Sequence, residues 1–367
     1  MNHSKRIMRS TMSWTKKITR GLGYFAYLTF AVAILLEIIF RILPVSDSMR
    51  VLPVNDSNPI LRFKENRAVS KQIGFDFTHV NVKNINNYGF ATDKEFIAQQ
   101  QTSKKLIAVI GDSQVEALQV DNSDTFHAIL DDEIKSINVY PIGMSGSPLS
   151  QYLAFARYAE RQFNPDVFVF LLTSNDFDQS WREIHQYPGF HYFNEEGALV
   201  LEEYQPSLLK SLAQYSSLLR YLHLDLKLSV QLKRMLNYNE NIETPVVKNS
   251  NKREQLGMKA IDFFISEIGI IANNKKVIFM LDGDRSAIYK GNRMRDSHKI
   301  ENHWYERVIS QVGMKENIMM LDLHIHFLNN WNESQKKFNY DYDNHWNEHG
   351  HQIAATALAH KLQEVLK

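Results

Sequence analysis

The chain has 367 residues, 44% of them hydrophobic, which is enough to bury a sizeable core. Its 42 Lys and Arg residues nearly balance its 41 Asp and Glu residues. The resulting formal net charge of +1 provides no global field for binding nucleic acid. Cysteine is absent, which excludes disulfides, thiolate metal sites and a cysteine nucleophile.

The N-terminal region predicts a membrane anchor. A basic tail at 1–20 precedes an apolar segment at 21–43, close to the roughly 20 residues that cross a bilayer. The basic flank predicts that the tail stays in the cytoplasm and that the body lies in the periplasm, held at the inner membrane by one span. Glu37 is near the far end of the segment, where a charge is tolerated. A cleaved signal peptide is the alternative, but Arg41 and the residues after it form a poor cleavage site.

After the anchor, residues 44–105 are mixed in character and predict a linker and a lead-in to the main domain at 106–367. In that domain, apolar strand-like runs alternate with helical patterns. The predicted strands are at 106–110, 137–142, 166–172, 276–281 and 317–321. The predicted helices are at 125–135, 149–162, 253–273, 298–312 and 349–366. This alternation predicts an α/β fold with a parallel sheet and helices on both faces.

An insertion at about 181–251 interrupts the alternation. It contains an aromatic stretch, a predicted helix at about 208–236 and a polar linker at 237–251. We expect the insertion to cap the sheet edge and to shape a substrate cleft. The aromatic residues suit stacking on sugars, and packing in the core is the alternative interpretation; they are Tyr187, Phe190, Tyr192 and Phe193.

The first predicted strand ends abruptly in Gly111-Asp112-Ser113. A serine on a turn at this point is exposed at the carboxyl edge of the sheet, where open α/β folds bind their ligands. Asp112 is expected to cap the turn. Turns of this composition are common, so the chemistry of Ser113 depends on what other segments bring to the same edge.

Three later segments supply suitable groups. Gly146 follows the second strand, and a glycine leaves a backbone N–H open to a ligand. Asn175 follows the third strand, where its side chain can donate to an oxyanion or cap a helix. Asp343 and His345 precede the last helix; a His can take a proton from a serine while an Asp orients its ring. His349 and His351 lie nearby and are alternative candidates for the base.

Together these residues resemble the SGNH, or GDSL, hydrolase superfamily. The residues that match the family's blocks, in the family's chain order, are Ser113, Gly146, Asn175, Asp343 and His345. The resemblance extends from about residue 84 to the C-terminus. It includes an Asn-x-x-Gly-Phe segment at 86–90 that is similar to one in membrane-anchored members.

The chain departs from the family pattern at two places. Thr173 stands where the third block usually has Gly. The acid Asp343 is two residues before His345, whereas the usual spacing of three would place it at Tyr342. The Asp-x-His-Trp order is similar to that of SGNH-like proteins of alginate acetylation, and Asp341 is an alternative orienting acid.

The resemblance implies a three-layer α/β/α sandwich with a flavodoxin-like parallel sheet of about five strands. It implies an acyl-serine mechanism in which Ser113 is the nucleophile, His345 the base and Asp343 the orienting acid. The oxyanion would be held by the backbone N–H groups of Ser113 and Gly146 and by the side chain of Asn175. The family needs no metal and no cofactor.

The predicted function is a serine esterase that removes acyl or acetyl groups from an envelope glycan, a lipid or a small ester. A polysaccharide O-acetyltransferase is the first alternative, and it needs a membrane partner to supply the acyl group. A non-catalytic envelope protein that binds glycans is the second alternative.

Overall fold

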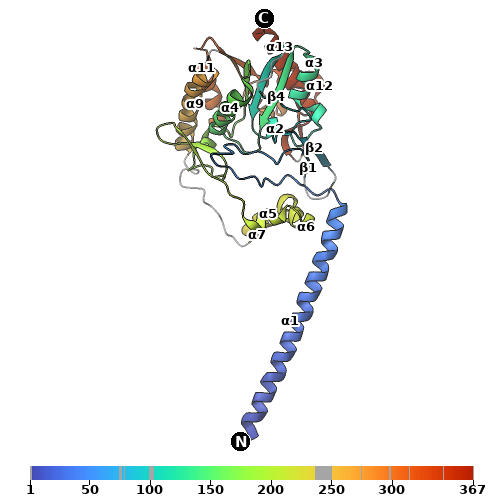
Figure 1. Cartoon of the computed structure of the whole chain (residues 1–367). Helices are drawn as coiled ribbons and strands as arrows, with labels where there is room; N and C mark the ends of the chain where they lie inside the picture. The colour runs from blue at the N-terminus through green and yellow to red at the C-terminus, as the bar shows by residue number, and fades with distance from the viewer. Residues whose placement is uncertain are drawn as a thin grey trace.

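The computed structural model describes residues 2–73, 77, 79–98, 103–235, 250–273, 275–296, 299–313, 315–341 and 343–366. The polar linker predicted at 237–251 lies almost entirely outside these residues, as do the first residue of the helix predicted at 298–312 and Tyr342. A long helix, α1 (Asn2–Ile42), extends from one side of a body that contains the remaining elements (Figure 1).

The body is built on a five-stranded parallel sheet. Its strands are β3 (Lys105–Gly111), β4 (Ile137–Gly143), β5 (Val167–Leu172), β8 (Lys276–Leu281) and β9 (Ile318–Asp322). They lie in the order β4-β3-β5-β8-β9, and each neighbouring pair is parallel, which is the flavodoxin-like arrangement. The strands are apolar along nearly their whole length because helices cover both faces. The predicted fold class is therefore confirmed.

Two helical layers enclose the sheet (Figure 1). One face packs against α4 (Leu149–Phe163), α9 (Ser250–Ala272) and α11 (Ile300–Val312). The other face packs against α3 (Phe126–Glu133), α12 (Leu323–Ser334) and α13 (Glu348–Val365). Of these helices, only α12 has no counterpart among the predicted ones.

The segment before the sheet is part of the same hydrophobic core. It contains an antiparallel hairpin of β1 (Arg67–Ile73) and β2 (His79–Ile85). Ile60, Phe63 and Phe90 are fully buried against the face that also carries α4. Burial of these side chains fixes the lead-in against the domain.

The insertion begins with a two-stranded hairpin of β6 (His191–Phe193) and β7 (Leu199–Leu201). Three of the four aromatic residues in the stretch at 187–193 are buried, namely Phe190, Tyr192 and Phe193, so the stretch packs largely as core.

The prediction of a single helix at 208–236 is wrong, because the chain there forms separate short helices. These are α5 (Leu208–Ala213), α6 (Ser217–Arg220), a π-type segment (Tyr221–Asp225) and α7 (Leu228–Met235). The side chain of Ser216 accepts a hydrogen bond from the N–H of Leu219 and so begins a new helix. Lys227, with φ of +49°, separates the π-type segment from α7.

The N-terminal helix α1 contains one stretch that is long and apolar enough to cross a membrane. This stretch is Lys17–Ile42, with a mean hydropathy of 2.1, and none of it is buried in the body. A membrane anchor and a signal sequence both have this character.

Candidate active site

Ser113 begins a short helix, α2 (Ser113–Glu116), directly after β3. Asp112 caps this helix as expected, since its Oδ1 accepts a 3.0 Å hydrogen bond from the N–H of Gln114. Gly111 is required before it, because a Cβ there would lie 2.4 Å from Cγ2 of Val115. The turn leaves Ser113 partly exposed at the carboxyl edge of the sheet.

The loop after β4 brings Gly146 to the same edge. Gly146 has φ of +80°, which a residue with a Cβ adopts only with strain. Buried Glu116 holds this loop through the N–H and hydroxyl of Ser145. Arg50, from the lead-in, forms a 2.9 Å ion pair with Glu116 and a 3.2 Å hydrogen bond to the carbonyl of Ser145. The lead-in therefore stabilises the loop that carries Gly146.

Asn175 follows β5, the strand next to β3, so it lies where the strand order reverses and such folds bind ligands. The hydroxyl of Thr173 is 3.1 Å from Oδ1 of Asn175, 3.2 Å from Oδ2 of Asp112 and 3.0 Å from Oδ1 of Asp176. One hydroxyl has one proton, so it cannot donate to all three oxygens at once.

A proton on Asp176 relieves part of this crowding. Burial, with the nearby charge of Asp112, raises the pKa of Asp176 well above its usual value. A protonated Asp176 can donate to the Thr173 oxygen, and the one hydroxyl proton of Thr173 is then shared between Oδ2 of Asp112 and Oδ1 of Asn175. The hydroxyl of Thr173 is thus placed to orient the amide of Asn175, whose Nδ2 has no partner among the described residues. Thr173 is the residue that departs from the family pattern.

His345 lies on β11 (Asp343–Trp346), a short strand before α13. Its ring Nδ1 and its backbone N–H both donate to Oδ1 of Asp343, the latter over 3.0 Å. Partial burial raises the pKa of Asp343, but these hydrogen bonds, the charge of His345 and that of Lys71 outweigh it, so the pKa ends below 3.8. Asp341, the alternative acid, is exposed and pairs with Lys337 instead.

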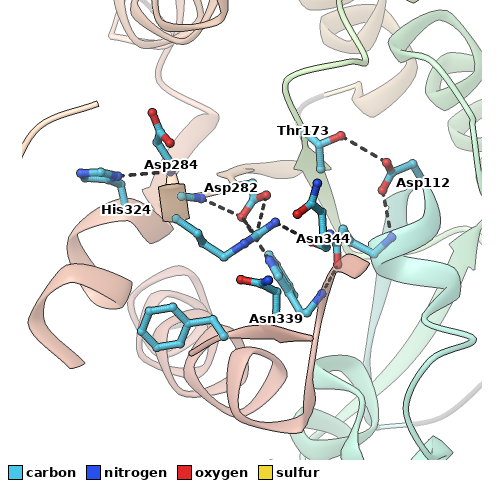
Figure 2. Close-up of polar contacts among 12 residues, drawn as sticks. Asp112, Thr173, Asp282, Asp284, His324, Asn339 and Asn344 are labelled. Atoms are coloured by element: carbon cyan, nitrogen blue, oxygen red, sulfur yellow. Dashed lines mark hydrogen bonds and ion pairs between the residues drawn. The ribbon is translucent and has the colours of Figure 1, made fainter. Parts of the chain in front are cut away.

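Trp346 and three residues that the sequence did not single out, Gln114, Asp282 and Arg285, fix the position of β11. The N–H of Trp346 donates to Oε1 of Gln114 over 3.1 Å, so the residue after His345 is bonded to the residue after Ser113. The Trp346 indole donates to Asp282, which also binds Arg285 over 2.8 and 2.9 Å. Arg285 in turn donates to the carbonyl of Asn344 over 2.8 Å, near the centre of Figure 2. Asp282 comes directly after the predicted strand at 276–281, and this position is the sequence feature that could have indicated it.

One cavity of about 860 Å³ joins these segments. Ser113, Gly146, Asn175 and His345 all line it, and Asp343 lies behind His345. Ser113 and His345 share the cavity without a direct hydrogen bond in the described structure. The backbone N–H groups of Ser113 and Gly146 have no hydrogen-bond partner within the described residues. The cavity thus contains a serine, an oriented imidazole and unused donors.

No group of three or more His, Asp or Glu residues in the described part of the chain has the arrangement of a metal site. The residues around the site are held in place by hydrogen bonds. Figure 2 shows Asp112 bonded to Thr173 and, farther away, Asp284 beside His324. The chemistry that this arrangement can carry out is nucleophilic attack with proton transfer through His345.

No family model and no curated protein matches the chain. Solved structures that it is similar to include a member of the lipolytic protein G-D-S-L family from Veillonella parvula, with a TM-score of 0.40 and 13% identity, covering 70% of this chain and 97% of that one. An acetyl xylan esterase from Butyrivibrio proteoclasticus has a TM-score of 0.36 and 10% identity, covering 73% and 66%. A family two carbohydrate esterase from Clostridium thermocellum, solved with cellohexaose, has a TM-score of 0.38 and 12% identity, covering 74% and 67%.

Proposed function

We propose that the protein is an SGNH-type serine esterase that removes small acyl groups from a carbohydrate. The observation that carries the proposal is the convergence of Ser113, Gly146, Asn175 and His345 on one cavity, with Asp343 bonded to the imidazole. These residues come from four separate segments of the chain. A merely structural cluster has no need to collect a hydroxyl, a base and unused donors.

In this mechanism Asp343 holds the proton on Nδ1 of His345, so Nε2 is free to accept the proton of Ser113. Oγ of Ser113 attacks the ester carbonyl, and the oxyanion is stabilised by the N–H groups of Ser113 and Gly146 and by the amide of Asn175. The imidazolium then gives its proton to the departing alcohol, which leaves an acyl-serine. Water, deprotonated by the same imidazole, hydrolyses that ester and restores Ser113.

The lining of the cavity supports a polar substrate. Among the described residues that line it there is no Ala, Val, Leu, Ile, Met or Phe. A long acyl chain would lack apolar side chains to pack on, whereas hydroxyl groups would find amides, carboxylates and cations. These features favour an acetylated glycan over a lipid.

The location we propose is the outer side of the inner membrane, with α1 as a single-span anchor. Its apolar stretch is unburied, and the basic residues before it favour a cytoplasmic tail. The body would then face the periplasm, where envelope glycans are found.

The first test uses the full chain in detergent with a fluorophosphonate probe. We expect the wild type to be labelled, Ser113→Ala to be unlabelled, and Ser174→Ala to be labelled like the wild type. Ser174 is the matched control because it is an exposed serine that lines the same cavity. Equal labelling of wild type and Ser113→Ala, or of neither, would exclude the catalytic proposal and favour a binding protein.

The second test identifies the acyl group and its acceptor. We expect hydrolysis of p-nitrophenyl acetate, little hydrolysis of the palmitate ester, and acetate release from an acetylated oligosaccharide in water alone. Acetyl transfer that occurs only after an acceptor oligosaccharide is added would instead identify an O-acetyltransferase. Preference for the palmitate ester would contradict the glycan assignment.

A further inference from the structure

The short helices of the insertion expose apolar side chains on one stripe each. In α5 these are Leu208, Leu209 and Leu212, followed by Tyr215; Leu212 is 67% exposed. In α7 they are Leu228, Leu232 and Met235, spaced by four and three residues; Met235 is 79% exposed. Such spacing places them on one side of each helix. An apolar surface of this kind is rarely left in water.

The end of α1 is bonded directly to this region. The carboxylate of Glu37 accepts hydrogen bonds from the hydroxyl of Ser216 over 2.7 Å and from the N–H groups of Ser217 and Leu218 over 3.1 and 3.0 Å. Arg41 donates to the carbonyl of Tyr215 over 3.0 Å. The Phe40 ring stacks on the ring of Tyr221, with 4.2 Å between the ring centroids. Glu37 therefore caps α6, and the helices lie at the level where α1 meets the body (Figure 1).

The charge of this region matches an anionic surface. Between residues 207 and 235 the sequence contains five Lys and Arg residues and one acidic residue, Asp225. One of the five, Arg220, is paired with Asp47 of the lead-in, which leaves four to face headgroups. The carboxylate of Asp225 accepts a hydrogen bond from the N–H of Ser46. Leucine-rich stripes with basic residues between them are typical of helices that lie in the headgroup region of a membrane.

We propose that α5, α6 and α7 form a membrane-surface platform that lies in the headgroup layer of the leaflet from which the body projects. The platform rests on the proposed anchor, because α1 places it at the end of the membrane span. Its apolar stripes enter the boundary of the acyl chains, and its basic residues contact anionic headgroups. The body is then attached at two places, the span and the platform, and its orientation over the membrane is fixed.

The test uses the absence of cysteine, which allows single nitroxide labels in the full chain. Leu212→Cys and Leu232→Cys report the platform, and Phe30→Cys reports the middle of α1. Ile270→Cys on α9 is the matched control, an exposed apolar residue of the body with 70% exposure. Each labelled chain is reconstituted in vesicles of phosphatidylethanolamine and phosphatidylglycerol, and collisions with oxygen and with a water-soluble nickel complex are compared.

We expect the labels at positions 30, 212 and 232 to collide mainly with oxygen and the label at 270 mainly with the nickel complex. If the labels at 212 and 232 are as open to nickel as the one at 270 while the one at 30 is in lipid, the platform is wrong and the anchor stands. If the label at 30 is also in water, both are wrong. Shielding of 212 and 232 from both reagents, or spin–spin broadening, would show that a protein or a second copy covers the stripe, which also overturns the platform.

Discussion

At the scale of single residues, Asp343 accepts two hydrogen bonds from His345. Both the ring and the backbone N–H of His345 donate to the same carboxylate oxygen. A spacing of two residues allows this arrangement, because the backbone N–H of His345 returns to the side chain as in an Asx-turn. The departure from the usual spacing of three is thus compatible with an oriented imidazole.

Asp343→Asn is expected to lower kcat by roughly 10²- to 10⁴-fold, because an amide no longer fixes the tautomer or stabilises the imidazolium. Asp341→Asn is the matched control and should retain close to wild-type activity. Kinetics on p-nitrophenyl acetate measure both. The reverse order of effects would assign the orienting role to Asp341.

The orientation of Asn175 gives a second prediction at this scale. Asn175→Ala removes an oxyanion donor and should lower kcat/KM by about 10²- to 10³-fold. Thr173→Val keeps the amide but removes the hydroxyl that orients it, so a smaller loss is expected. If Thr173→Val is as active as the wild type, Thr173 does not orient the amide.

These residue positions were predictable to different degrees. Ser113, Gly146 and Asn175 follow strands that are apolar along nearly their whole length, so their place at the sheet edge follows from the sequence pattern. The bond between Gln114 and Trp346 joins residues 232 positions apart, and no local pattern indicates it. The choice between Asp341 and Asp343 also depended on which side chain the fold turns toward the imidazole.

At the scale of elements, the hairpin of β1 and β2 places an ionisable lysine side chain in the protein interior. Lys83 is buried, and its Nζ has no hydrogen-bond partner in the described structure. Burial lowers the pKa of Lys83 from 10.5 to about 7, even though nearby carboxylates favour its charged form. Those carboxylates belong to Asp93, Asp121, Asp124 and Glu116.

This lowered pKa couples stability to pH. Between about pH 7 and pH 10.5 the unfolded chain holds the Lys83 proton more tightly than the folded chain does. The contribution of Lys83 to the free energy of unfolding therefore rises with pH across that window. Below it, Lys83 is charged in both states, and the full cost of burying the ammonium applies.

Lys83→Met should raise the free energy of unfolding by roughly 1–3 kcal/mol at about pH 6 and by less at about pH 9, since the neutral amine is cheaper to bury. Urea unfolding of the full chain in detergent at both pH values measures the difference. Lys64→Met, at an exposed lysine, serves as the control and should change little. An equal gain at both pH values would contradict the buried charge.

Elements were predicted well where burial dictates composition and poorly where it does not. The five sheet strands are buried on both faces, so their apolar runs are unambiguous. The helices of the insertion have an exposed apolar stripe, and a continuous helical pattern concealed the break at Ser216. The hairpin of β1 and β2 alternates weakly because Lys83 and Gln72 are buried polar residues.

At the scale of the whole molecule, the carboxylate of Glu37 accepts three of the hydrogen bonds that join α1 to the insertion. Glu37→Ala leaves the N–H groups of Ser217 and Leu218 without their acceptor. We expect a loss of about 0.5–2 kcal/mol, typical of a lost helix cap, confined to α5–α7. Limited proteolysis between 207 and 235 should therefore be faster than in the wild type. Glu196→Ala, an exposed carboxylate in a turn, is the control; equal cleavage rates in the two variants would show that the cap is not stabilising.

The Glu37 contact also bears on how the body of the protein is prepared without α1. A chain shortened to begin at Pro44, an obvious choice for producing a soluble enzyme, would lose the carboxylate that begins α6 and the ring of Phe40 that covers Tyr221. The leucines of α5 and α7 would at the same time face only water. Such a fragment is expected to aggregate even with its catalytic centre intact, so a failed soluble preparation would not indicate an inactive enzyme.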